Sequence, residues 1–290
     1  MPRFVVVALL AGCGWHGSDG GIPSDGLVDV AISLPDRDQD LVPDEIDNCP
    51  DVPNSDQGNV DSDPWGDACD GCPPWITGSE DRDGDGVFDL CDPYPDEPGD
   101  QIALVEPFRT IDHNRWIEIG GWVVDASGLR ATPSTVAPSL LISEQAFDYP
   151  TIEISFQAGQ FTLPRPGANR WAIEAWSGAS LDADQRLTGI RCQVALQDDR
   201  VFAAQLHHVD SSGASLLATN FFPLEEFQNY RFRVVTGTES RCLTTDFLHY
   251  LEQPDTVGLP LGRVAIGAQG IGLHVNVLVV YTRTAPPTPL

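Results

Sequence analysis

Positive charge is scarce in this sequence: 16 lysines and arginines stand against 43 aspartates and glutamates, for a formal net charge of −27. A surface this acidic repels phosphate backbones and anionic lipid headgroups, which excludes electrostatic binding to nucleic acid. The apolar run at the N-terminus is too short to span a bilayer as a helix. Beyond residue 100 the sequence shows no convincing amphipathic helix, which argues against a helical fold.

Recognisable catalytic strings are also missing. The sequence has no G-x-S-x-G motif and no catalytic-cysteine signature. It also has no E-x-D-x-x-E string, which in retaining glycosidases places two carboxylates about 5 to 5.5 Å apart. A binding protein is therefore the main prediction, and a glycoside hydrolase remains the alternative.

The seven cysteines are an odd number, which fits one modified cysteine plus three disulfides. Cys13 closes the run M-P-R-F-V-V-V-A-L-L-A-G-C, whose basic residue, apolar stretch and small-residue end are typical of a secretion signal. Its last four residues, L-A-G-C, resemble the lipobox of bacterial lipoproteins. This resemblance implies that residues 1–12 are a signal peptide and that Cys13 carries lipid. An ordinary cleaved signal is the alternative, and it would make the protein secreted.

Residues 13–35 are predicted to be a flexible tether, because Gly, Ser and Asp recur there without a sustained period. Acyl chains on Cys13 would hold this tether in a membrane, since each buried methylene contributes about 0.8 kcal/mol. We therefore expect a lipoprotein of the bacterial cell envelope, at the outer membrane or the cell surface.

Residues 36–100, here called the Asp-rich segment, carry 21 acidic side chains and only two basic ones. Such a segment would repel itself apart in water unless cations neutralised it. Near its end Asp81, Asp83 and Asp85 alternate, and Gly86 permits a sharp turn, as in oxygen-ligated calcium loops of the EF-hand type. Prolines interrupt both flanks, so we expect a free-standing series of calcium loops without long helices.

The string D-N-C-P-D-V-P-N-S-D-Q-G-N-V-D-S-D-P-W-G-D-A-C-D resembles a thrombospondin type 3 repeat. The matching positions are Asn48, Cys49, Pro50, Asn54, Gln57, Asp61, Asp63, Gly66, Asp67, Cys69 and Asp70. In that family aspartates wrap calcium ions, and disulfides connect neighbouring turns that have almost no hydrophobic core. Leu41 and Pro64 replace the usual turn glycine here, and Asn59 replaces an opening aspartate.

The resemblance implies calcium as the cofactor and three sets of ligands. They are Asp36, Asp38, Asp40, Asp44 and Asp47; Asn59, Asp61, Asp63, Asp67 and Asp70; and Asp81, Asp83, Asp85, Asp89 and Asp92.

Simple proximity favours two disulfides in this segment, Cys49 with Cys69 and Cys72 with Cys91. Each would close a loop of roughly 20 residues and contribute about 3 kcal/mol. Four cysteines allow three connectivities, which the sequence leaves open. Cys192 and Cys242 lie in expected strands and are predicted to pair across the sheet.

Residues 101–284 consist of short alternating apolar runs separated by Gly, Pro, Asn and Asp, as in Thr151 to Phe156 and Tyr230 to Val235. Period two at this spacing predicts a mainly β fold, an antiparallel sandwich of the jelly-roll type. The strings F-R-T-I-D-H-N-R-W-I-E-I-G-G-W-V-V-D and L-G-R-V-A-I-G-A-Q-G-I-G-L-H-V-N-V-L-V-V-Y resemble concanavalin A-like, laminin-G-like domains. Residues 285–290 are predicted to be a frayed tail.

Single acidic residues in the expected strands and loops of the sandwich are predicted to face solvent. A histidine pair fits an outward strand end as well as a metal site or a base. Two tryptophans are expected in the core, and a sugar-stacking face is the alternative for them. These residues are, in that order, Glu153, Glu174, Asp182 and Asp184; His207 and His208, close to Asp210; and Trp171 and Trp176.

Together these patterns predict a calcium-binding lipoprotein whose Asp-rich segment is a stalk that presents the β-sandwich. The sandwich would bind a glycan or a protein ligand in adhesion or recognition. The two alternatives are a carbohydrate-active enzyme built on the sandwich and a structural spacer with no ligand beyond calcium.

Overall fold

The structure is a computed structural model that describes residues 34–76, 78–125, 128–131, 138–161, 172–184, 186–196, 202–225, 227–236, 239–244, 250–254 and 259–286. Asp36–Leu290 form one compact unit. The predicted signal peptide, Cys13 and almost all of the predicted tether lie outside the described residues, as does Trp171. No described helix is long and apolar enough to cross a membrane.

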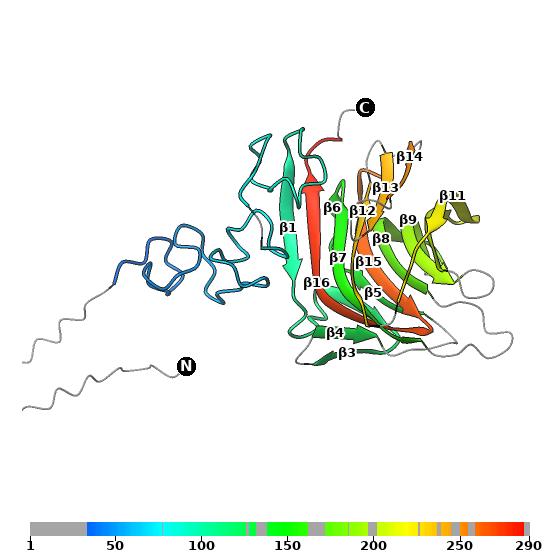
Figure 1. Ribbon diagram of the computed structural model, residues 1–290, viewed down its shortest axis with the longest axis horizontal. Helices are drawn as coiled ribbons and strands as arrows, with labels where there is room; N and C mark the ends of the chain where they lie inside the picture. The colour runs from blue at the N-terminus through cyan, green and yellow to red at the C-terminus, as the bar shows by residue number, and fades with distance from the viewer. Residues whose placement is uncertain are drawn as a thin grey trace, which may run out of the picture. The chain divides into compact units, whose positions relative to one another are not determined.

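All regular elements of the described residues are β-strands, which confirms the mainly β fold predicted from the period-two patterns (Figure 1). They are β1 (Asp100–Glu106), β2 (Trp116–Ile119), β3 (Trp122–Asp125), β4 (Gly128–Ala131), β5 (Ser139–Ser143), β6 (Phe147–Asp148), β7 (Thr151–Phe161), β8 (Ala172–Leu181), β9 (Leu187–Leu196), β10 (Phe202–Asp210), β11 (Gly213–Phe221), β12 (Asn229–Val235), β13 (Glu239–Thr244), β14 (Tyr250–Pro254), β15 (Leu261–Gln269) and β16 (Ile271–Arg283).

The strands form two antiparallel sheets. Sheet A has the order β14-β13-β12-β7-β16-β4-β3, and β1 also pairs with β16. Sheet B has the order β11-β10-β9-β8-β15-β5-β2, and β6 also pairs with β15. Side chains from both sheets enclose one large apolar core, so the domain is a β-sandwich.

Alternation along β7 shows how the sequence builds this layer. Ile152, Ile154 and Phe156 are fully buried and enter the core between the sheets. Glu153, between them, points to the opposite face of sheet A because successive strand residues alternate. A disulfide between Cys192 in β9 and Cys242 in β13 links the two sheets through this core.

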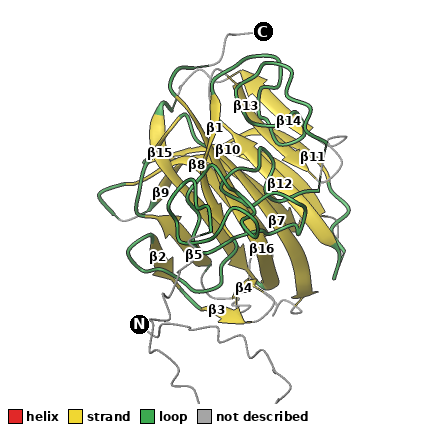
Figure 2. Cartoon of the chain, turned by 90° about the vertical axis from the view of Figure 1, so that its left-hand side faces the viewer, coloured by secondary structure: helices red, strands yellow, loops and turns green. Residues whose placement is uncertain are grey.

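The outer face of sheet A is covered by the Asp-rich segment. Val277, Val279 and Tyr281 of β16 are buried there against Cys72 and Cys91. Figure 2 shows the irregular loops drawn over β7, β12 and β16. This cover explains why β16 reads as a nearly continuous apolar run, since both of its faces are buried.

Candidate metal centre

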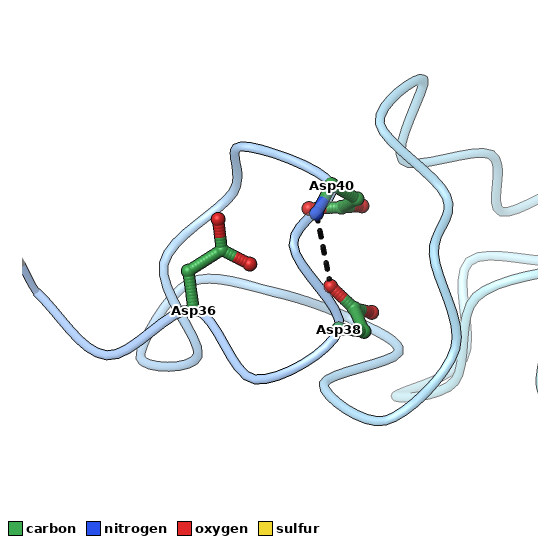
Figure 3. A group of neighbouring side chains, drawn as sticks. All are labelled: Asp36, Asp38 and Asp40. Carbon is green, nitrogen blue, oxygen red and sulfur yellow. Dashed lines mark hydrogen bonds between the residues drawn. The ribbon is translucent and has the colours of Figure 1, made fainter.

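Three loops of the Asp-rich segment repeat one backbone design. We call Asp36–Asp47 the first loop, Asn59–Asp70 the second and Asp81–Asp92 the third. In each loop, the side-chain oxygen of the opening residue accepts a hydrogen bond from the backbone N–H three positions later, at 2.7 to 2.8 Å. The carboxylates at positions three and five each accept one from the N–H two positions later. Figure 3 shows this pattern in the first loop, where Asp40 N donates to Asp38 Oδ1 over 3.2 Å.

The carboxylate at position nine closes each loop. Asp44, Asp67 and Asp89 accept a hydrogen bond from the backbone N–H of the second loop residue at 2.8 to 2.9 Å. In the third loop the other oxygen of Asp89 also accepts from Arg82 Nε at 2.7 Å. The carboxylates at position nine therefore connect the end of each loop to its beginning. The carboxylates that stand at positions one, three and five lie towards the centre of the loop.

One carboxylate oxygen at position three and one at position twelve remain without a partner in every loop. These Oδ2 atoms are buried and accept no hydrogen bond from the described residues. They belong to Asp38, Asp47, Asp61, Asp70, Asp83 and Asp92. A buried carboxylate oxygen without a hydrogen-bond partner is strongly unfavourable. Because such an oxygen recurs at positions three and twelve of all three loops, a cation is the partner to which these oxygens point.

The carboxylates gather closely enough for shared coordination. One oxygen from each member lies within 4.8 Å of the others in three groups within the loops: Asp36 with Asp38 and Asp40, Asp61 with Asp63 and Asp70, and Asp81 with Asp83 and Asp85. The remaining predicted ligands, Asp44, Asp47, Asn59, Asp67, Asp89 and Asp92, are not in these three groups. Carboxylate oxygens are ligands for a hard cation such as calcium.

Crowding of negative charge perturbs the titration of these groups. Burial raises the pKa of Asp38, Asp61 and Asp83. Burial also raises the pKa of Asp70 to about 6, with further increases from Asp63, Asp61 and Asp67. A bound cation would reverse these shifts by favouring the ionised forms.

The turn positions explain the departures from the repeat pattern. Gly84 and Gly86 have φ of 80° and 95°, and the equivalent Gln39 and Leu41 adopt the same left-handed region at 66° and 79°. The first loop thus adopts the same backbone conformation, but with residues that carry a Cβ and therefore strain the backbone there. In the second loop Pro64 lacks the N–H that Leu41 and Gly86 donate to the opening residue, so that hydrogen bond is absent.

Cross-links and amides hold successive loops together. The disulfides Cys49–Cys69 and Cys72–Cys91 are present, as proximity predicted. Gln57 Nε2 donates to Asp47 Oδ1 at 2.8 Å, and Asn54 N donates to Asp40 Oδ2 at 2.8 Å. Both amide residues match the repeat pattern, but neither belongs to the predicted ligand sets.

Arginines of sheet A capture the backbone of the third loop. Arg233 donates to the carbonyl oxygens of Cys91 at 2.7 Å and of Asp92 at 3.0 Å, and Arg231 donates to that of Leu90 at 3.1 Å. Glu153 lies beneath them and accepts from both guanidinium groups at 2.8 to 2.9 Å. The third loop is therefore fixed to the sandwich.

The expectation that Glu153 and Glu174 face solvent is wrong. Glu153 is 2% exposed and Glu174 is 8% exposed. Burial alone would raise the pKa of Glu153, but Arg233 and Arg231 outweigh it, so the pKa is lowered. Glu153 thus holds together the two arginines that contact the third loop.

The structure also shows where the other sandwich residues discussed above lie. Trp176 is buried among Ile142, Leu187 and Ala265, as expected of a core residue. Asp184 is exposed in the loop between β8 and β9. His207 is buried beside Gln193, with 3.2 Å between their side-chain nitrogens, so the expected outward strand end is wrong for this histidine.

A cavity of about 560 Å³ lies between the second loop and β1. Its lining mixes apolar residues of β1 with polar side chains, among them Asp56, Asp67, Asp70, Arg109 and Arg115. This volume is within the range of small-ligand sites. Two of the lining carboxylates, at positions nine and twelve of the second loop, also belong to the predicted calcium ligands.

No protein-family model matches the chain, and no curated protein matches it. Solved structures do. The Emp47p carbohydrate recognition domain aligns at 10% identity and a TM-score of 0.49 over 64% of this chain and 98% of that one. The VIP36 exoplasmic/lumenal domain, in its Ca²⁺/Man3GlcNAc-bound form, aligns at 11% identity and a TM-score of 0.47 over 63% and 90%. The Bacillus licheniformis β-glucanase aligns at 11% identity and a TM-score of 0.44 over 62% and 97%.

Proposed function

We propose that this protein is a calcium-binding lipoprotein of a bacterial cell envelope, in which the three loops are thrombospondin type 3-like repeats and the sandwich binds a glycan. The observation that carries the proposal is the set of buried carboxylate oxygens without hydrogen-bond partners at positions three and twelve of every loop. These unpartnered oxygens recur at the same positions of three loops, which fits a ligand bound by each loop better than a chance arrangement in one of them.

Calcium is the cation that best suits this site. The candidate ligands are carboxylates, and hard oxygen donors favour calcium or magnesium over zinc or copper. Magnesium requires near-ideal octahedral geometry, whereas calcium accepts six to eight oxygens in flexible arrangements such as these loops. Three disulfides also suit an oxidising compartment outside the cytosol, where free calcium is plentiful.

The proposed location rests on the N-terminal sequence. Lipid on Cys13 would attach the chain to a membrane, and the Gly- and Asp-rich residues 14–35 would separate the folded unit from the bilayer. In the proposed arrangement calcium stiffens the loops, and the sandwich is held away from the anchor.

We place the glycan in the cavity between the second loop and β1. Sugar hydroxyls both donate and accept hydrogen bonds, and the cavity offers carboxylates, guanidinium groups and the hydroxyl of Thr110. Because Asp67 and Asp70 belong both to this lining and to the second loop, glycan binding is expected to depend on calcium. The neighbouring Arg115 is fixed by a salt bridge to Glu106 at 3.2 Å, which keeps one wall in place.

Calorimetric titration of the full chain with calcium tests the metal proposal. We expect saturable binding at about 10⁻⁴ to 10⁻³ M per site, as in extracellular calcium modules. Asp61→Asn and Asp83→Asn should each weaken or remove binding at one loop. Asp51→Asn is the matched control, because its side chain is 71% exposed and lies outside the carboxylate groups. Absence of saturable heat from the unsubstituted chain would refute the proposal.

A glycan array probed with the full chain, in calcium and in chelator, tests the ligand proposal. We expect binding that requires calcium and is weakened at least tenfold by Arg109→Ala in the cavity. Arg130→Ala, which removes a 59% exposed arginine of β4 away from the cavity lining, should leave binding unchanged. A blank array in calcium would instead favour a structural spacer, and an Arg109→Ala variant that binds normally would refute this location.

Membrane fractionation of Cys13→Ser tests the anchor, since an unlipidated chain should leave the membrane fraction.

A further inference from the structure

The sandwich begins with a buried carboxylate that meets the third loop. Asp100, the first residue of β1, is 1% exposed. One of its oxygens lies within 4.8 Å of carboxylate oxygens from Asp85 and Asp92. Asp100 is not among the predicted calcium ligands. The three residues join positions five and twelve of the third loop to the first strand of sheet A.

Asp92 shows that this group requires a further partner. Its side chain is 3% exposed, and its Oδ1 accepts a hydrogen bond from Tyr94 N at 2.6 Å. Its Oδ2 is buried and accepts no hydrogen bond from the described residues. A buried carboxylate with an unpartnered oxygen, grouped within 4.8 Å of two other carboxylates, is a position for a cation.

Three arginines lie near this group, and each also has partners outside it. Arg283 of β16 forms a salt bridge with Asp100, while its two terminal nitrogens also donate to the carbonyl oxygens of Glu97 and Pro98 at 3.2 Å. Arg233 donates to the carbonyl oxygen of Asp92 at 3.0 Å and is paired with Glu153. Arg241 donates to Pro93 O at 3.2 Å and stacks on the Tyr94 ring.

The backbone around the group is already arranged by Asp85. Its Oδ2 accepts from Gly99 N at 2.9 Å and from Asp100 N at 2.7 Å. Asp40 of the first loop likewise accepts from the N–H fourteen residues later, that of Asn54. The residue after this donor is Ser55 in the first repeat but Asp100 in the third. The additional carboxylate is therefore specific to the loop that docks on the sandwich.

We propose that Asp85, Asp92 and Asp100 bind a calcium ion that fastens the third loop to the first strand of the sandwich. This inference rests on the proposed calcium function of the loops and adds a site that bridges loop and sandwich. Occupancy of this site makes the docking of the third loop dependent on calcium, because without the ion the buried carboxylates of Asp92 and Asp100 and the half-buried one of Asp85 gather within 4.8 Å of one another.

Asp100→Asn in the full chain is the test, with calcium alone as the probe. By calorimetry we expect the variant to bind one ion fewer than the unsubstituted chain. By hydrogen exchange, we expect the amides of β1 to lose the protection that calcium otherwise gives them. Asp96→Asn is the matched control, since it removes a 79% exposed carboxylate nearby and should change neither result.

The outcomes separate the two proposals. If the unsubstituted chain binds no calcium, the proposed function fails. If it binds calcium and Asp100→Asn binds the same number of ions equally well, only the bridging site is refuted. Should Asp100→Asn fail to fold, a crystal structure of the unsubstituted full chain with its loops loaded with calcium decides the question. A calcium ion coordinated by Asp100 supports the site, and its absence overturns it.

Discussion

Trp75 of the Asp-rich segment donates a hydrogen bond from its indole Nε1 to Oε1 of Glu153 in β7, across 3.1 Å. The indole ring also lies beneath the guanidinium of Arg231, 5.1 Å from its centre. One buried carboxylate of the sandwich therefore receives hydrogen bonds from its own sheet and from a segment 78 residues away. This contact makes the Asp-rich segment part of the folded unit.

Glu153→Gln tests the weight of that contact. The substitution keeps the shape of the side chain but leaves Arg231 and Arg233 buried without a carboxylate. We expect a loss of about 3 to 5 kcal/mol in the free energy of unfolding, as for other buried ion pairs from which one partner is removed. Urea denaturation in calcium measures it.

Glu144→Gln is the matched control for Glu153→Gln. Glu144 is 46% exposed and lies 3.5 Å from Arg263, so removing its charge should change the free energy of unfolding by less than about 1 kcal/mol. If the free energy of unfolding of Glu153→Gln lies within about 1 kcal/mol of that of the unsubstituted protein, the carbonyl oxygens around the two arginines suffice to stabilise their charge. The carboxylate is then dispensable for stability.

Local interactions are the part of this structure that the sequence made predictable. The loops are held by hydrogen bonds between residues two to seven apart, so the spacing of aspartates and turn residues marks them directly. The strands follow from alternation, as in Thr151 to Phe156, because each residue answers to the face on which it lies.

The docking of the Asp-rich segment was not predictable by the same means. It depends on partners far apart in the sequence, such as Arg283 with Glu97 and Arg233 with Cys91. Each residue alone fits a surface strand, which is why Glu153 was expected in solvent. Two signals pointed to the cover: the unbroken apolar run at the end of β16, and the arginines that alternate with Phe232 in β12.

Calcium removal is expected to loosen the three loops unequally. The third loop keeps its hydrogen bonds to Arg231 and Arg233 of the sandwich, whereas the first is held by its own turns and by Asn54 and Gln57 of the same segment. Hydrogen exchange measured by mass spectrometry in chelator should therefore be fastest in 36–47, intermediate in 59–70 and slowest in 81–92. The amides of β12 provide the internal control and should stay protected. Equal exchange in all three loops would show that docking does not stabilise the third.

The metal-free protein should become less stable as pH rises from about 4 to 6.5. The folded pKa of Asp70 is about 6, above an unfolded value near 3.9, so the folded state holds a proton that the unfolded state has lost in this window. The free energy of unfolding falls by about 1 to 3 kcal/mol across this window, and this loss is complete above the folded pKa of Asp70. The lowered pKa of Glu153 acts below this window.

Thermal unfolding in chelator across this pH range measures the effect. Asp70→Asn should reduce the pH dependence without abolishing it, because the pKa of Asp92 is also raised, to about 8, and that of Asp100 to about 6. Asp51→Asn, which removes a 71% exposed carboxylate, should leave the pH dependence unchanged. In calcium the trend should reverse, because calcium and protons compete for the same oxygens. Stability that rises with pH in chelator would show that these carboxylates are ionised without metal.

Leu41→Gly should stabilise the first loop. Leu41 has a φ of 79° and is 90% exposed, so glycine relieves backbone strain without losing apolar burial. Strain of about 1 to 2 kcal/mol at this position outweighs the roughly 0.5 to 1 kcal/mol by which glycine increases unfolded-state entropy. The reciprocal variant is Gly86→Ala at the equivalent position, where no atom lies within 4 Å of an added Cβ. Backbone conformation is then the sole difference, and calcium affinity should rise for Leu41→Gly and fall for Gly86→Ala. Calorimetry of both in the same buffer decides, and a gain for Gly86→Ala would mean that calcium does not require the left-handed turn.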